Sequence, residues 1–280
     1  LFIGGNGDFL SGGFAARLLL ARSLGCSLLT FDHRDVGASS GTLHAASDLV
    51  EDAAMCVEHL LQSGRCASAE HLILYGQSMG GAVAAALAAD RYPQCAVVNC
   101  RSFASLTDAA VGRTDLSRIR ELIRTALTLG FGGLLPWAPP LETVGLWHRL
   151  KVGRKLLVFH IRDEVLGAAA ALHTGLLAQG EGALVGTDVI RLTERARSPH
   201  NDDICAFEPA AWEQVAEWVA SRFDEAATSR VDSIEDLEAL DETGTRRRTE
   251  KASLLPRGTG SAATAPSAAS RAKRCGDVVI

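Results

Sequence analysis

Short apolar runs alternate with segments of helical periodicity along the first 223 residues. Runs with the length of strands lie at 1–3, 27–31, 71–75, 96–98, 155–159 and 188–192. Helical spacing of apolar residues covers 14–24, 46–61, 80–89 and 211–223. This alternation is typical of βαβ units, which build a parallel sheet with helices on both faces. The pattern therefore predicts an α/β fold with a mostly parallel sheet, whose ligands bind where the strands end.

Two segments depart from the alternation. Residues 101–152 contain one helical stretch, 116–127, and then a run rich in Gly, Pro and Trp, so we expect a short cap insertion over the site. After Phe223 no aromatic residue follows and charges occur in blocks, which predicts a folded domain over 1–224 and a disordered tail over 225–280 with no identified partner. The chain begins inside an apolar run without Met, so we expect a further segment upstream, and with it any targeting signal.

Composition narrows the class of protein. The 280 residues are 47% hydrophobic and 22% charged, as in ordinary globular proteins, and the net charge of −5 argues against nucleic acid as a main partner. The longest uncharged run, 125–141, is interrupted by glycines and prolines, so no membrane span is expected. The seven cysteines are scattered and form no C-x-x-C pair, which favours a reducing, cytoplasmic location over a disulfide framework or a zinc site.

The main candidate for chemistry is a G-x-S-x-G sequence, Gly76 to Gly80, between a predicted strand and a predicted helix. In a nucleophile elbow the serine sits on a sharp strand-to-helix turn, and the flanking glycines are needed because larger side chains would clash. The turn places the Ser78 hydroxyl beside the start of the helix, where backbone N–H groups can stabilise an oxyanion. Ser78 is therefore the candidate nucleophile.

A serine nucleophile needs a base, and the base needs a carboxylate that orients it. His200 and Asp163 each follow a predicted strand, whereas the other histidines lie in or beside predicted strands, helices or the cap segment. Glu164 competes with Asp163 for the role of the acid. The candidate donors to the oxyanion are the backbone N–H groups of Asn6, in the glycine-rich loop after the first run, and of Met79.

Together these motifs resemble the α/β-hydrolase superfamily, and in particular its serine aminopeptidase S33-like, or BEM46/ABHD-like, serine hydrolases. The resemblance covers about residues 1–223. Its motifs are Gly4–Gly7, Phe31–Gly41, Gly76–Gly81, Asp163–Leu166 and His200–Asp202. Three departures stand out: Gly4 replaces the usual His of the oxyanion loop, and the spacing from His160 to Asp163 is one residue shorter than in the common pattern. The resemblance also implies that the chain starts at the third strand of the family, so we expect the first two strands upstream.

The resemblance implies a serine hydrolase that cleaves a carboxylic ester, a thioester or a related acyl bond through an acyl-serine intermediate. Ser78 would attack, His200 would carry the proton and Asp163 would orient the imidazole, with no metal or cofactor. The apolar residues at 134–141 favour a small-molecule or lipid-like acyl substrate. The alternative is a catalytically inactive binding or scaffold protein on the same fold, which the altered oxyanion loop and the long tail would suit.

Overall fold

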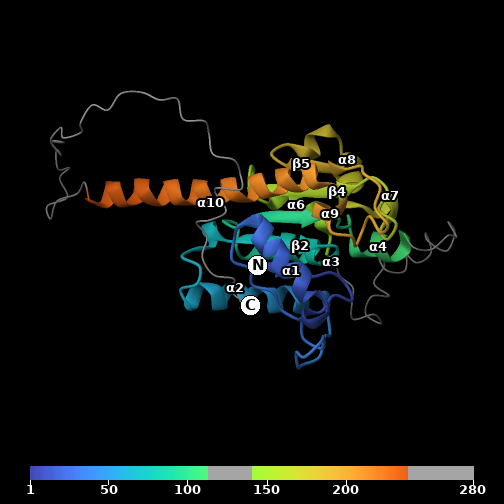
Figure 1. The fold of residues 1–280 in the computed structure, drawn as a ribbon, viewed down its shortest axis with the longest axis horizontal. Helices are drawn as coiled ribbons and strands as arrows, with labels where there is room; N and C mark the ends of the chain where they lie inside the picture. The colour runs from blue at the N-terminus through green and yellow to red at the C-terminus, as the bar shows by residue number, and fades with distance from the viewer. Residues whose placement is uncertain (113–140, 239–280) are drawn as a thin grey trace.

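The computed structural model describes residues 1–112 and 141–238, and a parallel sheet forms its centre (Figure 1). The five strands lie in the spatial order β1-β2-β3-β4-β5, which is also their order along the chain. They are β1 (Phe2–Ile3), β2 (Ile73–Gln77), β3 (Ala96–Cys100), β4 (Lys155–His160) and β5 (Asp188–Leu192). Every neighbouring pair is parallel. The predicted α/β fold is confirmed.

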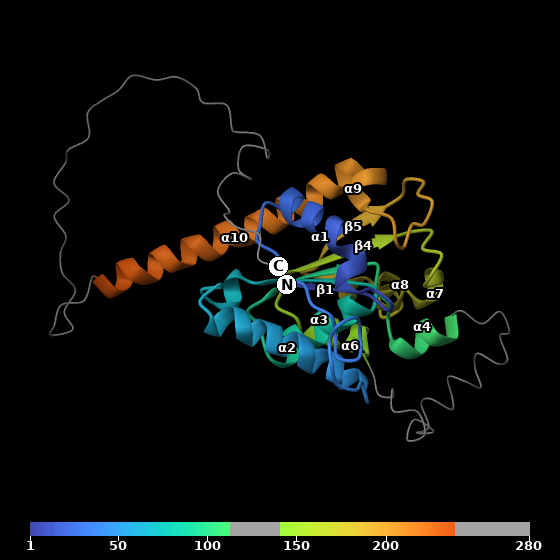
Figure 2. The ribbon, with the colours of Figure 1, turned by 60° about the horizontal axis from the view of Figure 1, so that its bottom comes forward.

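Helices cover both faces of the sheet (Figure 2). One face carries α1 (Leu10–Leu24) and α10 (Pro209–Glu238), and the opposite face carries α2 (Ala46–Gln62), α3 (Met79–Asp90) and α6 (Thr143–Arg149). Each face has its own cluster of buried apolar side chains. The short elements are α4 (Leu106–Gly112), α7 (Gly167–Ala170), α8 (Leu172–Leu177), α9 (Ile204–Phe207) and the 3₁₀ turns η1 (Ala69–His71) and η3 (Glu181–Leu184).

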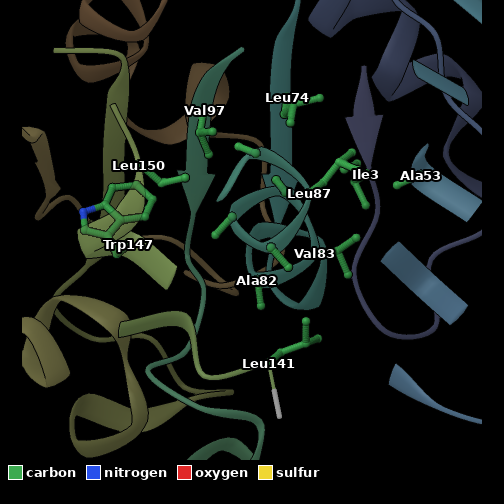
Figure 3. Packing of buried hydrophobic residues seen from close by; sticks show 14 of the residues in the cluster. Ile3, Ala53, Leu74, Ala82, Val83, Leu87, Val97, Leu141, Trp147 and Leu150 are labelled. Atoms are coloured by element: carbon green, nitrogen blue, oxygen red, sulfur yellow. The ribbon is translucent and has the colours of Figure 1, made fainter. Parts of the chain in front are cut away.

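Helix α3 is the central helix of its face, between α2 and α6. Its residues from Gly80 to Ala88 are all buried, as expected of a helix that is apolar around its whole circumference. Figure 3 shows Val83 and Leu87 of this helix close to Ile3, Leu74 and other side chains of the strands. Because most of its residues are Gly and Ala, the helix can lie close to the sheet.

The order of the strands reverses at β1, because the chain goes first to residues 27–31 on one side of β1 and then to β2 on the other side. Phe2 pairs with Tyr75 of β2 on one side and with Thr30 on the other, and both pairings are parallel. The segment predicted as a strand at 27–31 contributes only this single bridge, because β1 has two residues to offer. The connection that leaves β1 runs through α1 on one face, whereas the connection that leaves the neighbouring strand β2 runs through α3 on the opposite face. A crevice at the carboxyl ends of the strands is expected at such a switch point.

Two expected boundaries are wrong. The strand predicted at 71–75 runs instead over 73–77, because residues 69–71 form η1 and the pairing with β3 continues to Gln77. The C-terminal part of the expected cap also belongs to the core. Helix α6 packs against α3, and its Trp147 is completely buried, which removes the large apolar surface of the indole from water. Residues 113–140 of the expected cap, which include the helix expected at 116–127, lie outside the described residues.

Helix α10 continues to Glu238 and extends beyond the sheet (Figure 1). Residues 225–238, expected to belong to the unstructured tail, are therefore helical. Between 210 and 238 there is no glycine or proline, and Ala, Glu and Arg are strong helix formers. The rest of the expected tail, 239–280, lies outside the described residues. Within the two described ranges, no helix is long and apolar enough to cross a membrane.

Candidate active site

The turn between β2 and α3 has the backbone of a nucleophile elbow. Ser78 lies at φ 53° and ψ −121°, a strained conformation for a residue other than glycine, and its N–H donates to the carbonyl of Cys100 at 2.9 Å. A Cβ on Gly76 would overlap the carbonyl group of Gly80, and a Cβ on Gly80 would overlap the carbonyl oxygen of Ile3. Both glycines are therefore required by close backbone contacts.

The structure brings Ser78, His200 and Asp163 into one hydrogen-bonded chain. The Ser78 Oγ lies 3.0 Å from His200 Nε2, and His200 Nδ1 lies 2.7 Å from Asp163 Oδ2. These three residues come from the ends of β2, β4 and β5, although 122 positions separate Ser78 from His200. Both side chains of the His200–Asp163 pair are nearly inaccessible to solvent, with 4% and 5% exposed. The hydrogen bond between them is therefore protected from competition with water.

The Asp163 carboxylate is held in its ionised form. Burial raises its pKa, but hydrogen bonds from the His200 ring and from the backbone N–H groups of Leu166 and Val165 outweigh burial, and the pKa lies below its ordinary value. The two backbone donors lie 2.9 and 3.0 Å from Oδ1, whereas the imidazole faces Oδ2. Each carboxylate oxygen therefore has its own donor set, and this fixes the orientation of the carboxylate.

Glu164 contacts the histidine loop and not the imidazole. Its Oε2 accepts the backbone N–H of His200 at 3.1 Å, and its Oε1 accepts the Ser198 hydroxyl. Of the two acidic candidates that the sequence left open, only Asp163 touches the ring. Glu164 instead ties the loop that carries His200 to the end of β4.

Arg101, which the sequence analysis missed, supports the same loop from β3. It follows the last residue of that strand, has φ 52° and is buried. Its Nη1 donates to the carbonyls of Pro199 and Asp202 at 2.9 and 2.8 Å, on both sides of His200. Gln77 adds a hydrogen bond of 3.3 Å to the carbonyl of His200. The available signal was position alone, since Arg101 follows a strand at the edge where sites form.

The glycine-rich loop after β1 lies against Ser78. A Cβ on Gly5 would come within 3.1 Å of the Ser78 Cβ, so the backbone of the loop passes beside the hydroxyl. Met79 is the first residue of α3, where backbone N–H groups have no partner within the helix. Within the described residues, the backbone N–H groups of Asn6 and Met79 donate to no other backbone group. Two donors from different segments are thus available near the nucleophile.

A cavity of about 930 Å³ opens at the hydroxyl of Ser78. On the α3 side its lining is apolar and includes Ala46, Leu49, Met79, Phe103, Leu106, Ala109, Val165 and Leu166. The lining also includes apolar side chains of the other face, such as Phe2, Leu20 and Trp212, and the charged residues Arg17, Arg101 and Asp203. Ser78 and His200 line the same cavity. A substrate with an apolar group can therefore lie next to the reacting hydroxyl.

The histidine that flanks the acid loop has a structural role. His160 is buried, its Nε2 lies 2.9 Å from the carbonyl of Glu194, and its Nδ1 accepts the N–H of Arg162. Both ring nitrogens are occupied, which makes it a poor base for Ser78. Within the described part of the chain, no group of three His, Cys, Asp or Glu side chains could hold a metal ion.

Comparison with known proteins gives a family model and structural neighbours. Residues 15–130 match the model described as serine aminopeptidase, S33. Esterase Pf2001 of Pyrococcus furiosus, in one crystal form, is 17% identical over 79% of this chain and 81% of that chain, with a TM-score of 0.55. A second crystal form of the same esterase is 16% identical over 79% of each chain, with a TM-score of 0.54. Mouse alpha/beta hydrolase domain-containing protein 10 is 17% identical over 80% of this chain and 90% of that chain, with a TM-score of 0.44. No curated protein matches the chain significantly.

Proposed function

We propose that the chain is a serine hydrolase of the α/β-hydrolase superfamily, which cleaves a carboxylic ester or thioester through an acyl-serine intermediate. The observation that carries this proposal is the hydrogen-bonded chain from Ser78 Oγ through His200 to Asp163. A lone serine is a weak nucleophile, and a base within hydrogen-bond reach that is itself oriented by a carboxylate is what activates it.

In the first half of the reaction, Ser78 Oγ bonds to the acyl carbon and its proton passes to His200 Nε2. The negative charge that develops on the carbonyl oxygen is stabilised by the backbone N–H groups of Asn6 and Met79. Asp163 keeps the His200 Nδ1–H directed toward itself and stabilises the imidazolium. When the carbon–oxygen or carbon–sulfur bond breaks, the leaving alcohol or thiol takes the proton from His200, and the acyl group remains on Ser78.

In the second half, water replaces the alcohol. His200 takes a proton from the water, the resulting hydroxide bonds to the acyl carbon, and the second tetrahedral intermediate expels Ser78 Oγ. Ser78 recovers its proton from His200, and the carboxylic acid leaves. All the proton transfers use groups of this chain, so the reaction needs water and no other reactant.

The shape of the cavity supports an acyl substrate with an apolar acyl chain. The cavity of about 930 Å³ is lined by Met79, Phe103 and Leu166 as well as by Ser78, and it has room for several methylene groups. Burying each methylene contributes about 0.8 kcal/mol. The Pyrococcus furiosus neighbour is named as an esterase, and we extend that substrate class to this chain because of the cavity, since fold alone does not define an activity.

The test combines an active-site probe with a substrate series. A fluorophosphonate probe should label the wild-type protein at Ser78 and leave Ser78→Ala unlabelled. With p-nitrophenyl esters of increasing chain length, kcat/KM should rise with the number of methylenes until the apolar part of the cavity is full. Ser78→Ala should lower kcat about 10⁴-fold or more. A folded wild-type protein that neither reacts with the probe nor hydrolyses any ester would refute the proposal and favour the binding or scaffold alternative.

A further inference from the structure

The loop that carries Asn6 is built from residues that do not hold a conformation by themselves. Glycines occupy positions 4, 5 and 7, and Gly7 has φ +78°. An N–H group that stabilises an oxyanion must already point at the developing charge, because reorientation during the reaction reduces its benefit. Within the loop the structure records one turn hydrogen bond, from Asp8 N–H to the Gly5 carbonyl at 3.2 Å. Further support has to come from outside the loop.

A buried arginine on α1 supplies that support. The Nη2 of Arg17 lies 2.5 Å from Asp8 Oδ1, and its Nη1 donates to the carbonyl of Phe9 at 3.2 Å. Its guanidinium carbon lies 5.4 Å from the centre of the Phe2 ring, within the range of a cation–π contact. Only 6% of Arg17 is exposed. One guanidinium therefore connects the end of the loop to the residue that begins β1.

The Asp8 carboxylate also fixes the beginning of the loop. A Cβ on Gly4 would come within 2.5 Å of Asp8 Oδ2 and within 3.1 Å of the Asp8 Cβ and Cγ. The Asp8 side chain thus occupies the space that a side chain at position 4 would need. A Cβ on Gly13 would come within 3.0 Å of the Arg17 guanidinium carbon, so that glycine leaves room for the guanidinium. Small residues on both sides make this arrangement possible.

We propose that the Asp8–Arg17 pair positions the oxyanion loop and holds the Asn6 N–H in place beside Ser78. Gly4 has no side chain that could hold the loop in its place. The inference rests on the proposed hydrolase activity. Both are positioning residues and not catalytic residues, because they act through the backbone of the loop. Removing the pair should therefore weaken the stabilisation of the oxyanion and leave the binding of the uncharged ester nearly unchanged.

The first test is Asp8→Ala, assayed with a p-nitrophenyl ester. We expect kcat to fall about 10- to 100-fold, since a displacement of about 1 Å at a reacting group can cost 10²-fold, with KM within about threefold of wild type. Asp8→Asn keeps the size of the side chain and an oxygen that can accept from Arg17, so it should retain most of kcat. Unchanged kcat in folded Asp8→Ala, or a rise in KM alone, would overturn the proposal.

A trifluoromethyl ketone distinguishes positioning from general stability. It forms a hemiketal in which Ser78 Oγ bonds to the carbonyl carbon, the hydroxyl proton passes to His200 and the oxygen becomes an oxyanion. Its inhibition constant should rise in Asp8→Ala by the same factor by which kcat/KM falls. The matched control is the exposed ion pair of Arg91 and Glu51, where Arg91→Ala should alter neither quantity. An inhibition constant that stays at the wild-type value would refute a role at the oxyanion.

Asp8→Ala leaves the guanidinium of Arg17 buried without its partner, and this variant could fail to fold for that reason. Gly4→Ala then provides a second test, because it keeps the Asp8–Arg17 pair. The new methyl group would collide with the Asp8 carboxylate, so we expect a loss of kcat, with KM nearly constant. Unaltered kcat in Gly4→Ala would contradict the proposal. Amide hydrogen exchange of the peptide covering residues 1–10 should speed up in each variant that loses kcat. If instead the wild-type protein has no activity that depends on Ser78, the hydrolase proposal fails, and exchange still tests the contact between pair and loop.

Discussion

Asp163→Asn changes one atom of the side chain and reverses the direction of its hydrogen bond to His200. The Oδ1 atom accepts two backbone N–H groups, from Val165 and Leu166. An asparagine must keep its oxygen at that position to accept both donors, so its NH₂ group faces His200 Nδ1. The imidazole then has to accept at Nδ1 and carry its proton on Nε2, the nitrogen that lies 3.0 Å from Ser78 Oγ. In that tautomer it cannot take the serine proton.

The expected loss follows from this tautomer. An aspartate-to-asparagine change that leaves geometry intact but selects the wrong tautomer costs roughly 10⁴ in kcat. Glu164→Gln is the matched control, because it makes the same chemical change one residue away, where the carboxylate contacts only the backbone of His200 and the Ser198 hydroxyl. The glutamine oxygen can still accept one of these two hydrogen bonds. We expect its kcat to remain within about tenfold of wild type, consistent with the loss of one hydrogen bond of about 1 kcal/mol.

The assay is the initial rate of ester hydrolysis for the wild type and both variants, with thermal unfolding to show that each is folded. If Glu164→Gln lost more activity than Asp163→Asn, the orienting carboxylate would be Glu164 and the hydrogen-bond polarity described above would be irrelevant to the reaction.

Further predictions concern the supports of the site. Arg101→Met should lower kcat by more than tenfold, because Nη1 holds the two carbonyls that flank His200, and it should also lower thermal stability, because both carbonyls lose their donor; equal kinetics would show that the loop holds itself. Gly80→Ala should destabilise the fold by about 1–3 kcal/mol in urea unfolding, because its methyl group meets the backbone of β1, whereas Gly145→Ala on α6 meets nothing within 4 Å and should not destabilise. The lowered pKa of Asp163 means that its carboxylate stabilises the fold fully above about pH 4 and loses this effect as pH falls through the lower folded value. The difference in unfolding free energy between wild type and Asp163→Asn should therefore shrink below pH 4, and a constant difference would contradict this.

Much of the fold was predictable from apolar periodicity, because the strands and helices here are short, regular and buried. The strand at 155–160 and the helix at 46–62 lie within one residue of their predicted bounds. The strand expected at 27–31 has equally good local sequence, but a strand needs a partner, and β1 offers only two residues. Helix α10 shows the opposite case, since charged residues without glycine or proline continue a helix that the loss of aromatic residues had suggested should end.

The sequence predicted those residues of the candidate site that belong to a recognisable motif. The elbow around Ser78 has a local sequence signature, because close backbone contacts exclude a side chain at Gly76 and at Gly80, only four positions apart. The choice between Asp163 and Glu164 has no such signature. Adjacent residues on a loop point in different directions, and only the path of the chain after β4 determines which carboxylate reaches His200. That information lies in the contact with β5 and not in the local sequence.

The residues that support the site are harder to predict from the sequence than the residues that react. Arg101, Glu164 and Arg17 each form at least one hydrogen bond with a backbone atom, which every residue has, so that partner carries no recognisable side chain. A motif records the side chain that reacts, because the chemistry demands it, whereas a loop can be held by any group of suitable charge and reach. If positioning is what these residues supply, their replacement should lower kcat without altering which ester is preferred. Residues of the apolar lining, such as Phe103, should instead change the preferred chain length.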